Sequence, residues 1–267
     1  YMEGFAMTRQ RVRKLTLIIS LLLFPVTLYY FSPALIINAG LGGIVNGSFI
    51  VFAALFLLSI PFGRLFCAYL CPAGGLQECA FPVNERVPVQ GWRNRIKYVV
   101  WVVWLAAVLF CYFQKGRILA VDFFFETEKG ISVSSVQSYL IYYGIVCLIL
   151  APAILSGKRA FCHYFCWMAP FMAAGIKLRR LLRLPGLCVR EKEKEECISC
   201  GKCRRACPMG IDVESEIKDG SIQSLECILC GACIDSCPAR ALGYGVRPVK
   251  SRRNFDKGHD NGGGKKT

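Results

Sequence analysis

Long uncharged stretches alternate with short basic segments through the first two thirds of the chain. The uncharged stretches cover residues 15–37, 44–62, 98–114 and 139–155. A helix that crosses a bilayer needs about 20 apolar residues, because each residue adds about 1.5 Å along the axis and the hydrocarbon core is about 30 Å thick. The pattern therefore predicts four transmembrane helices.

The basic residues stand at particular ends of these stretches. Arg and Lys precede the first stretch, fill the segment between the second and third, and follow the fourth, whereas residues 38–43 have none and residues 115–138 balance them with acids. Cytoplasmic flanks carry the excess of Lys and Arg. We therefore expect a multi-pass protein of the cell (inner, cytoplasmic) membrane, with its N-terminus and C-terminal third in the cytoplasm.

Composition agrees with a membrane protein. Of the 267 residues 54% are hydrophobic and 19% charged, more apolar surface than one soluble core would hide. The formal net charge is +15, from 33 Lys and Arg against 18 Asp and Glu. Because most of this charge lies beside the predicted spans, it suits lipid headgroups, and we expect no nucleic-acid partner.

A short motif occurs twice, after the second and after the fourth stretch. Residues 63–71 and 158–166 share Arg, Phe, Cys, Tyr and Cys at a constant offset of 95. The repeat predicts two helix-hairpin pseudo-repeats in a transmembrane domain of residues 1–186. We expect a ferredoxin-like domain at 187–246 and a flexible basic tail at 247–267.

Two cysteine runs in the C-terminal third, at 197–208 and 227–238, each read C-x2-C-x2-C-x3-C-P. This is the run of bacterial two-cluster ferredoxins, in which the fourth cysteine binds the other cluster. Structural zinc is the alternative that four thiolates leave open. The predicted ligands are Cys197, Cys200, Cys203 and Cys237 for cluster 1, and Cys227, Cys230, Cys233 and Cys207 for cluster 2.

Each copy of the repeat carries a Cys-x3-Cys pair, Cys67 with Cys71 and Cys162 with Cys166. On one helix face such residues have Cβ atoms about 5–6 Å apart, too far for a disulfide. If the two halves pack together, four sulfurs converge, and we hypothesise an additional iron-sulfur site at the membrane boundary. His163, with Met168 nearby, leaves a copper site as an alternative.

Several other residues carry weaker signals. Arg64 and Arg159 each precede a cysteine pair and could stabilise thiolates or a cluster, or reach lipid headgroups. With only two histidines, a bis-histidine haem b is not expected. The unpaired cysteines are expected to be small packing residues, and the aromatic residues to be belt and packing residues, in surroundings that a quinone headgroup would also favour. These residues are Cys79, Cys111, Cys147 and Cys188, and Trp92, Trp101, Trp104, Tyr142 and Tyr143.

Taken together, these motifs resemble the NapH/MauN-type membrane ferredoxins, the membrane components of 4Fe-4S quinol dehydrogenases, which are related to NosR and to CcoG (FixG, RdxA). The resemblance rests on Arg-x-Phe-Cys-x3-Cys-Pro at Cys67 and Cys71, on its second copy, and on the two ferredoxin runs. It implies four spans, two cytoplasmic [4Fe-4S] clusters and electron transfer from quinol toward partner reductases. One departure is that Trp167 follows Cys166, with proline delayed to Pro170.

The expected fold is thus an all-α membrane protein with a small cytoplasmic α+β two-cluster ferredoxin-like domain. The expected function is that of a membrane-bound iron-sulfur subunit that moves electrons between its [4Fe-4S] clusters and a membrane quinone/quinol pool or another redox subunit. The expected partners are membrane lipid, quinone and further redox proteins. A copper- or metal-handling reductase for oxidase assembly is the alternative.

Overall fold

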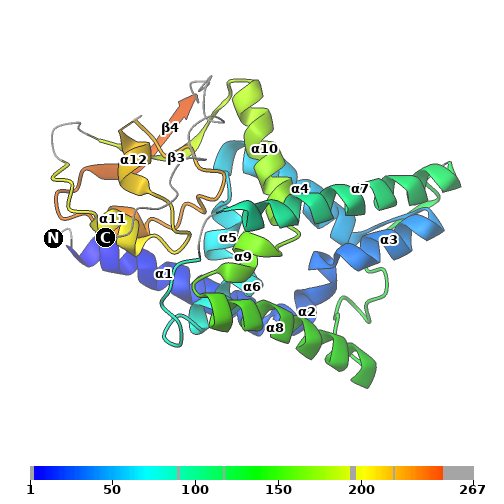
Figure 1. Ribbon diagram of the computed structural model, residues 1–267. Coiled ribbons are helices and arrows are strands. Elements are labelled where there is room, and N and C mark those ends of the chain that lie inside the picture. The colour runs from blue at the N-terminus through cyan, green and yellow to red at the C-terminus, as the bar shows by residue number, and fades with distance from the viewer. Residues whose placement is uncertain (1–2, 89–90, 117, 193–196, 219, 249–267) are drawn as a thin grey trace, which may run out of the picture.

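The computed structural model describes residues 3–88, 91–116, 118–192, 197–218 and 220–248. Helices make up most of these residues, and a small domain with a two-stranded sheet lies at one end (Figure 1). The helices that extend away from this domain are the apolar ones, and the cysteine repeats lie between the two parts.

The first uncharged stretch does not form one helix. The chain forms α1 (Glu3–Leu22), α2 (Phe24–Thr27), the 3-10 helix η1 (Leu28–Phe31) and α3 (Pro33–Gly42). It bends by 60° between Arg9–Leu22 and Phe24–Phe31. Pro25 and Pro33 each stand in the first turn of a new helix, and proline disfavours helical backbone in the residue before it. The first stretch is therefore bent, and a span over 15–37 stays a prediction.

Two helices in the described part of the chain are long and apolar enough to cross a membrane. They are α7 (Ile96–Lys115) and α8 (Val136–Ser156), which match the third and fourth predicted stretches. The bent pair could be a third span, whereas α4 (Gly47–Phe62) is a shorter apolar helix. Four spans therefore remain a prediction.

The outer faces of α7 and α8 are apolar and uncovered. Val103 on α7 is 66% exposed, and Leu140 and Leu155 on α8 are 71% and 78% exposed. Apolar side chains at this density on a helix surface are typical of contact with lipid. These helices are therefore suited to a membrane rather than to water.

The segments before α4 and after α7 meet in a small sheet. Strand β1 (Ile44–Asn46) pairs in parallel with β2 (Ala120–Asp122). The Asn46 side chain also caps α4, since its amide oxygen accepts from the backbone N–H of Phe49. Both segments therefore lie at the same end of the helical part.

Short helices carry the repeated motifs in the middle of the molecule (Figure 1). The first copy forms α5 (Leu65–Tyr69) and α6 (Pro72–Cys79), and the second forms α9 (Ala160–Tyr164) and α10 (Ala169–Leu181). The 3-10 helix η2 (Trp92–Arg95) precedes α7. The side of α1 packs against α5 and α6, so the first copy is held between α1 and the rest of the helices.

The C-terminal domain combines two strands and three short helices. Antiparallel strands β3 (Pro185–Glu191) and β4 (Leu242–Pro248) enclose α11 (Lys202–Ala206), α12 (Val213–Ile217) and α13 (Ala232–Asp235). This is the α+β composition expected from the sequence. Residues 247 and 248, placed in the tail by the sequence, belong to β4, and the rest of the predicted tail lies outside the described residues.

Candidate functional site

Four cysteines from the two ferredoxin runs line one pocket of the C-terminal domain. They are the predicted cluster 1 residues, and Val213, Ile217 and Leu242 complete the wall. Cys197 and Cys200 are exposed, so this pocket lies at the surface of the domain. The pocket brings together Cys197, Cys200, Cys203 and Cys237.

A second pocket holds the other four cysteines of the runs. Its remaining lining is apolar and includes Val189, Met209 and Ile228. It lies deeper than the first, because two of its cysteines sit in α13 or just before it and are buried. The pocket brings together Cys207, Cys227, Cys230 and Cys233.

The loops around the two pockets have matching backbone conformations. Ser199 and Leu229 each precede the second cysteine of their run with φ of 49° and 58°, a left-handed region that residues other than glycine rarely adopt. Gly201 and Gly231 follow with φ of 66° and 75°. Such backbone turns amide groups inward around a ligand site, so both loops are shaped alike.

The donor set of these pockets fits an iron-sulfur cluster. Each pocket has four thiols, the ligation that a [4Fe-4S] cluster uses, in a wall that is apolar in the second pocket and mostly apolar, with Ser199 and Glu214, in the first. Within the described ranges, no three His, Cys, Asp or Glu side chains come close enough to hold a single metal ion. Burial raises the pKa of Cys207 to about 11, so a thiol here releases its proton only when a metal centre compensates.

The four cysteines of the repeated motif form a third group, inside the molecule. All four are at most 5% exposed and belong to one cluster of buried side chains. Burial, and then the neighbouring Cys162 and Cys67, raise the pKa of Cys166 to about 12. The structure thus brings together Cys67, Cys71, Cys162 and Cys166, although the pairs are far apart in the chain.

The two copies share their local backbone geometry. The amide of Cys71 donates to the carbonyl of Phe66, and the amide of Cys166 to that of Phe161, both at 3.0 Å. The first cysteine of each copy lies in a five-residue helix, and the second lies beyond its end. The expectation that each pair shares one continuous helix face is therefore wrong, because the helix ends between the two cysteines.

The copies differ after the second cysteine. Helix α6 begins at Pro72, directly after Cys71, whereas α10 begins only at Ala169. In the gap, the Trp167 indole N–H donates to the carbonyl of Phe31 at 2.9 Å. The delayed proline of the second copy therefore corresponds to a different local structure, with Trp167 packed beside the cysteine group.

Soft and polar side chains surround this third group. The Cys67 thiol lies 3.9 Å from the Met172 sulfur, and the Gln77 amide donates to the Cys162 sulfur at 3.2 Å. His163, the chain neighbour of Cys162, is fully buried, and burial lowers its pKa to about 4. Its imidazole is therefore neutral at physiological pH.

A buried carboxylate connects the third group to the second pocket. Glu226, which precedes Cys227, pairs with Arg64 at 2.8 Å and with Lys97 at 2.6 Å. Burial alone would raise the pKa of Glu226, but the charges of Arg64 and Lys97 outweigh it and lower the pKa to about 2. Leu229 packs against Gly63 at the start of the motif. The second pocket thus sits directly on the first motif copy.

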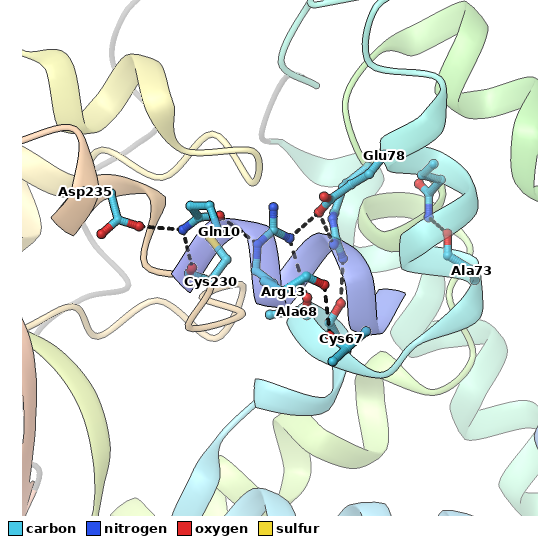
Figure 2. A network of polar contacts seen from close by, with 11 residues as sticks. Gln10, Arg13, Cys67, Ala68, Ala73, Glu78, Cys230 and Asp235 are labelled. Carbon is cyan, nitrogen blue, oxygen red and sulfur yellow. Dashed lines mark hydrogen bonds and ion pairs between the residues drawn. The ribbon is translucent and has the colours of Figure 1, made fainter. Parts of the chain in front are cut away.

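A second buried carboxylate, Glu78, forms an ion pair with Arg159, the arginine of the second motif copy. Glu78 pairs with Arg13 at 2.6 Å and also with Arg159, whose guanidinium donates to the carbonyl of Cys67 at 2.8 Å (Figure 2). Arg64 and Arg159 are at most 1% exposed. They therefore do not reach lipid headgroups, and of the two roles considered from the sequence the structure favours stabilisation of the cysteine group.

The N-terminal helix binds the ferredoxin-like domain directly. Arg9 pairs with Asp235 at 2.7 Å, and the Gln10 amide donates to Asp235 and to the carbonyl of Cys230 (Figure 2). Two of the basic residues that the sequence assigned to the membrane flank, Arg9 and Arg13, are thus ion-paired within the protein.

The unpaired cysteines divide into two kinds. Cys111 and Cys188 are buried as expected for packing residues, whereas Cys79 and Cys147 are exposed. Cys147 lies on α8, where exposure means contact with lipid if the helix spans a membrane.

Sequence reasoning missed the two carboxylates that organise the site. Both Glu78 and Glu226 stand beside cysteine motifs in a strongly basic chain, and Glu78 is the only charge in α6. Buried charges require partners, so an isolated acid in an apolar segment was the available signal. Their partners lie 65 to 162 positions away and could not be read from the sequence.

Comparison with protein families identifies iron-sulfur domains in both halves. The family described as "4Fe-4S dicluster domain" matches residues 190–238. The family described as "4Fe-4S binding domain" matches twice, at residues 47–95 and 140–185, and each match contains one Cys-x3-Cys pair. The repeated motifs, and not only the ferredoxin runs, therefore resemble iron-sulfur sequences.

Three curated relatives are similar in sequence to part of this chain, at low identity. YccM of Escherichia coli (strain K12), assigned by name to electron transport, is 22% identical over 70% of this chain and 53% of its own length. MJ0750 of Methanocaldococcus jannaschii, an uncharacterized protein, is 24% identical over 60% and 65%. NirI of Paracoccus denitrificans is 29% identical over 61% and 24%.

The chain spans less than two thirds of each of these relatives. No solved structure matches it. The matched 4Fe-4S domains and the relatives YccM and NirI nevertheless agree with the cysteine geometry, and the chain fits, at low identity, a family of membrane ferredoxins.

Proposed function

We propose that this protein is a membrane-bound electron-transfer subunit that moves electrons between iron-sulfur clusters and a membrane quinone/quinol pool or a partner redox subunit. The observation that carries the proposal is the series of three cysteine groups. They lead from an exposed pocket through a buried pocket to a buried group beside the apolar helices.

The ferredoxin-like domain would hold two [4Fe-4S] clusters with the ligand sets that line its pockets. Each bound cluster supplies one-electron redox chemistry. The protein's part is to fix the clusters and control access to them: Cys197 and Cys200 leave the first pocket open to a soluble partner, while the burial of Cys230 and Cys233 shields the second.

The Cys-x3-Cys group is a third metal centre in this proposal, with Cys67, Cys71, Cys162 and Cys166 as ligands. Four buried thiolates would carry a large negative charge, which the protein must balance. Arg64 and Arg159 are placed to do so: burial raises the pKa of Cys67, and the charges of the two arginines oppose that rise. A cluster here would link the second pocket to the membrane helices.

The membrane arrangement we propose has four spans, with the N-terminus, the cysteine motifs and the ferredoxin-like domain in the cytoplasm. The β1–β2 pair supports it, because the two segments without basic excess meet at one end of the helices. The ferredoxin-like domain lies at the opposite end (Figure 1). The basic flanks then face the cytoplasm, as expected for membrane proteins.

A copper-handling reductase is the second candidate, and one contact favours it. The sulfurs of Cys67 and Met172 lie 3.9 Å apart, and fully buried His163 belongs to the same motif. Thiolate, thioether and imidazole are the ligands that copper prefers. In this candidate the ferredoxin clusters would reduce copper bound transiently at the third group.

Iron and acid-labile sulfide counts on anaerobically purified protein, with EPR, test the proposal. About eight irons indicate the two ferredoxin clusters, and about four more indicate a cluster at the third group. Loss of only these additional irons in the Cys67→Ser variant would assign them. Stoichiometric copper that the same variant removes supports the second candidate, and zinc without iron in the wild type contradicts both.

A further inference from the structure

An aromatic chamber lies beside the second motif copy. It has a volume of about 130 Å3, and Lys97, Trp101, Trp104, Phe165, Trp167 and Phe171 line it. Phe165 and Trp167 are the neighbours of Cys166 in the chain. Two residues of the chamber wall are therefore adjacent in the chain to one member of the third cysteine group.

A larger apolar cavity continues from this chamber. It has a volume of about 660 Å3, lies among residues of α3, α4 and α7, and shares Phe52, Trp104 and Phe171 with the chamber. Because α7 is a candidate membrane span, the cavity opens among the apolar helices. A ligand dissolved in lipid could reach the chamber without passing through water.

The polar side chains of the chamber are hydrogen-bond donors. The indole N–H groups of Trp104 and Trp167 are used, since they donate to the carbonyls of Pro33 and Phe31. The Trp101 indole nitrogen is buried and has no hydrogen-bond partner among the described residues. A buried donor without an acceptor is unfavourable, so the chamber is suited to a ligand that brings an acceptor.

Lys97 supplies a second donor. Its ammonium group bonds to Glu226 at 2.6 Å, and an ammonium has three N–H donors, so this contact leaves others available. The lining includes no carboxylate. The ligand should therefore be flat and apolar, with acceptor oxygens.

We propose that this chamber binds the ring of a membrane quinone, with the isoprenoid tail in the larger cavity. The inference rests on the proposed function and gives it a location. Phe171 forms edge-to-face contacts with Trp101 at 5.4 Å and Trp104 at 5.6 Å, which makes an aromatic wall for a ring. The quinone oxygens accept from the Trp101 indole and from Lys97.

The placement also fits the electron count. Oxidation of one quinol to quinone breaks two O–H bonds, releases two protons to solvent and supplies two electrons. The two clusters proposed for the ferredoxin-like domain take one electron each. Cys166, a member of the third cysteine group, is the chain neighbour of Phe165 and Trp167, which line the chamber.

Two valines on α7 provide a matched test. Val100 lines the chamber and is 59% exposed, whereas Val103 is 66% exposed and lines none of the cavities described above. We expect Val100→Phe to weaken binding of decylubiquinone to the purified full-length holoprotein at least about tenfold, as measured by tryptophan fluorescence quenching, and Val103→Phe to leave it within about twofold. Trp101→Phe keeps the ring but removes the donor, and should weaken binding about tenfold.

Equal binding by the Val100 and Val103 variants, or unchanged binding by Trp101→Phe, would overturn the location. Native mass spectrometry provides a second check. The proposed location would also be overturned if phospholipid filled the cavity and decylubiquinone did not displace that phospholipid. Iron counts and reduction by dithionite report on the clusters separately. Failure of the chamber and failure of the proposed function are therefore distinguishable.

Discussion

The two kinds of cysteine site in this protein are built in opposite ways. In the ferredoxin-like domain each run supplies three cysteines from a short loop, and Cys197 and Cys200 remain exposed. In the Cys-x3-Cys group two segments far apart in the chain supply two cysteines each, and all four are buried. The first kind depends on local backbone, and the second depends on how the whole helical part packs.

The two kinds of site also differ in the charged side chains around them. No ion pair to a motif arginine is found at the described residues of the first pocket, whereas Arg64 and Arg159 are buried at the third group and each has a carboxylate partner. Burying charge is unfavourable unless it is paired. The interior site is therefore tied to its surroundings much more tightly than the exposed one.

The largest effect should come from removing a ligand of the buried ferredoxin pocket. Cys233→Ser should lower the iron content by about four atoms per protein, because a cubane that loses one thiolate in an apolar pocket is no longer held. Iron and sulfide analysis measures this change. The exposed Cys79→Ser is the control, and equal iron in both variants would contradict the assignment.

Exposure to air should separate the sites by rate. We expect the first cluster to be lost first, so that Cys197 and Cys200 react with iodoacetamide at least about tenfold faster than Cys67 and Cys71. The latter are shielded, and burial raises their pKa, which keeps a released thiol protonated and unreactive. Mass spectrometry of the labelled protein follows the reaction. Simultaneous labelling would contradict the difference in accessibility.

Loss of a buried carboxylate should destabilise the interior site. Glu226→Gln leaves Arg64 and Lys97 without a counter-charge, and breaking such a pair costs about 3–5 kcal/mol. Thermal unfolding of the purified protein should show a lower midpoint. Exposed Glu85→Gln is the matched control, with no expected change. If the two variants melt alike, Glu226 does not hold the domain in place.

The smallest effects should come from the two matched loop glycines. At both positions alanine would have to adopt left-handed backbone, which costs about 1–2 kcal/mol of stability. We expect Gly231→Ala to destabilise the protein more than Gly201→Ala. A Cβ at Gly231 would lie 2.6 Å from the Tyr244 hydroxyl, which donates to the Leu229 carbonyl. At Gly201 the nearest atom is a flexible arginine nitrogen at 3.3 Å. Thermal unfolding with both clusters present compares them, and the opposite order would contradict the prediction.

Features set by the local sequence could be predicted, and features set by the packing of distant segments could not. The ferredoxin runs could be recognised because their spacing is local, and α7 and α8 because they are long and uninterrupted. The bend in the first stretch could not be predicted, because Pro25 and Pro33 start new helices inside an apolar stretch and hydropathy does not register that change.

The partners of the motif arginines were beyond reach for a different reason. Whether Arg64 meets a lipid phosphate or Glu226, 162 positions away, depends on tertiary packing that no local pattern records. The same is true of Lys97, a basic residue at the start of an apolar helix that the structure places in the interior. Sequence indicated which residues carry the chemistry, and packing decided how their charges are balanced.

The double pairing of Glu226 has a consequence for how electrons leave the protein. If the ferredoxin-like domain moved away, two cations would be left unpaired in an apolar interior, so in the proposed function it would act as a fixed relay and not as a mobile shuttle. The distances between the proposed cluster sites would then be fixed when the protein folds. In the proposed function, a partner redox protein would approach the first pocket at Cys197 and Cys200, which are exposed.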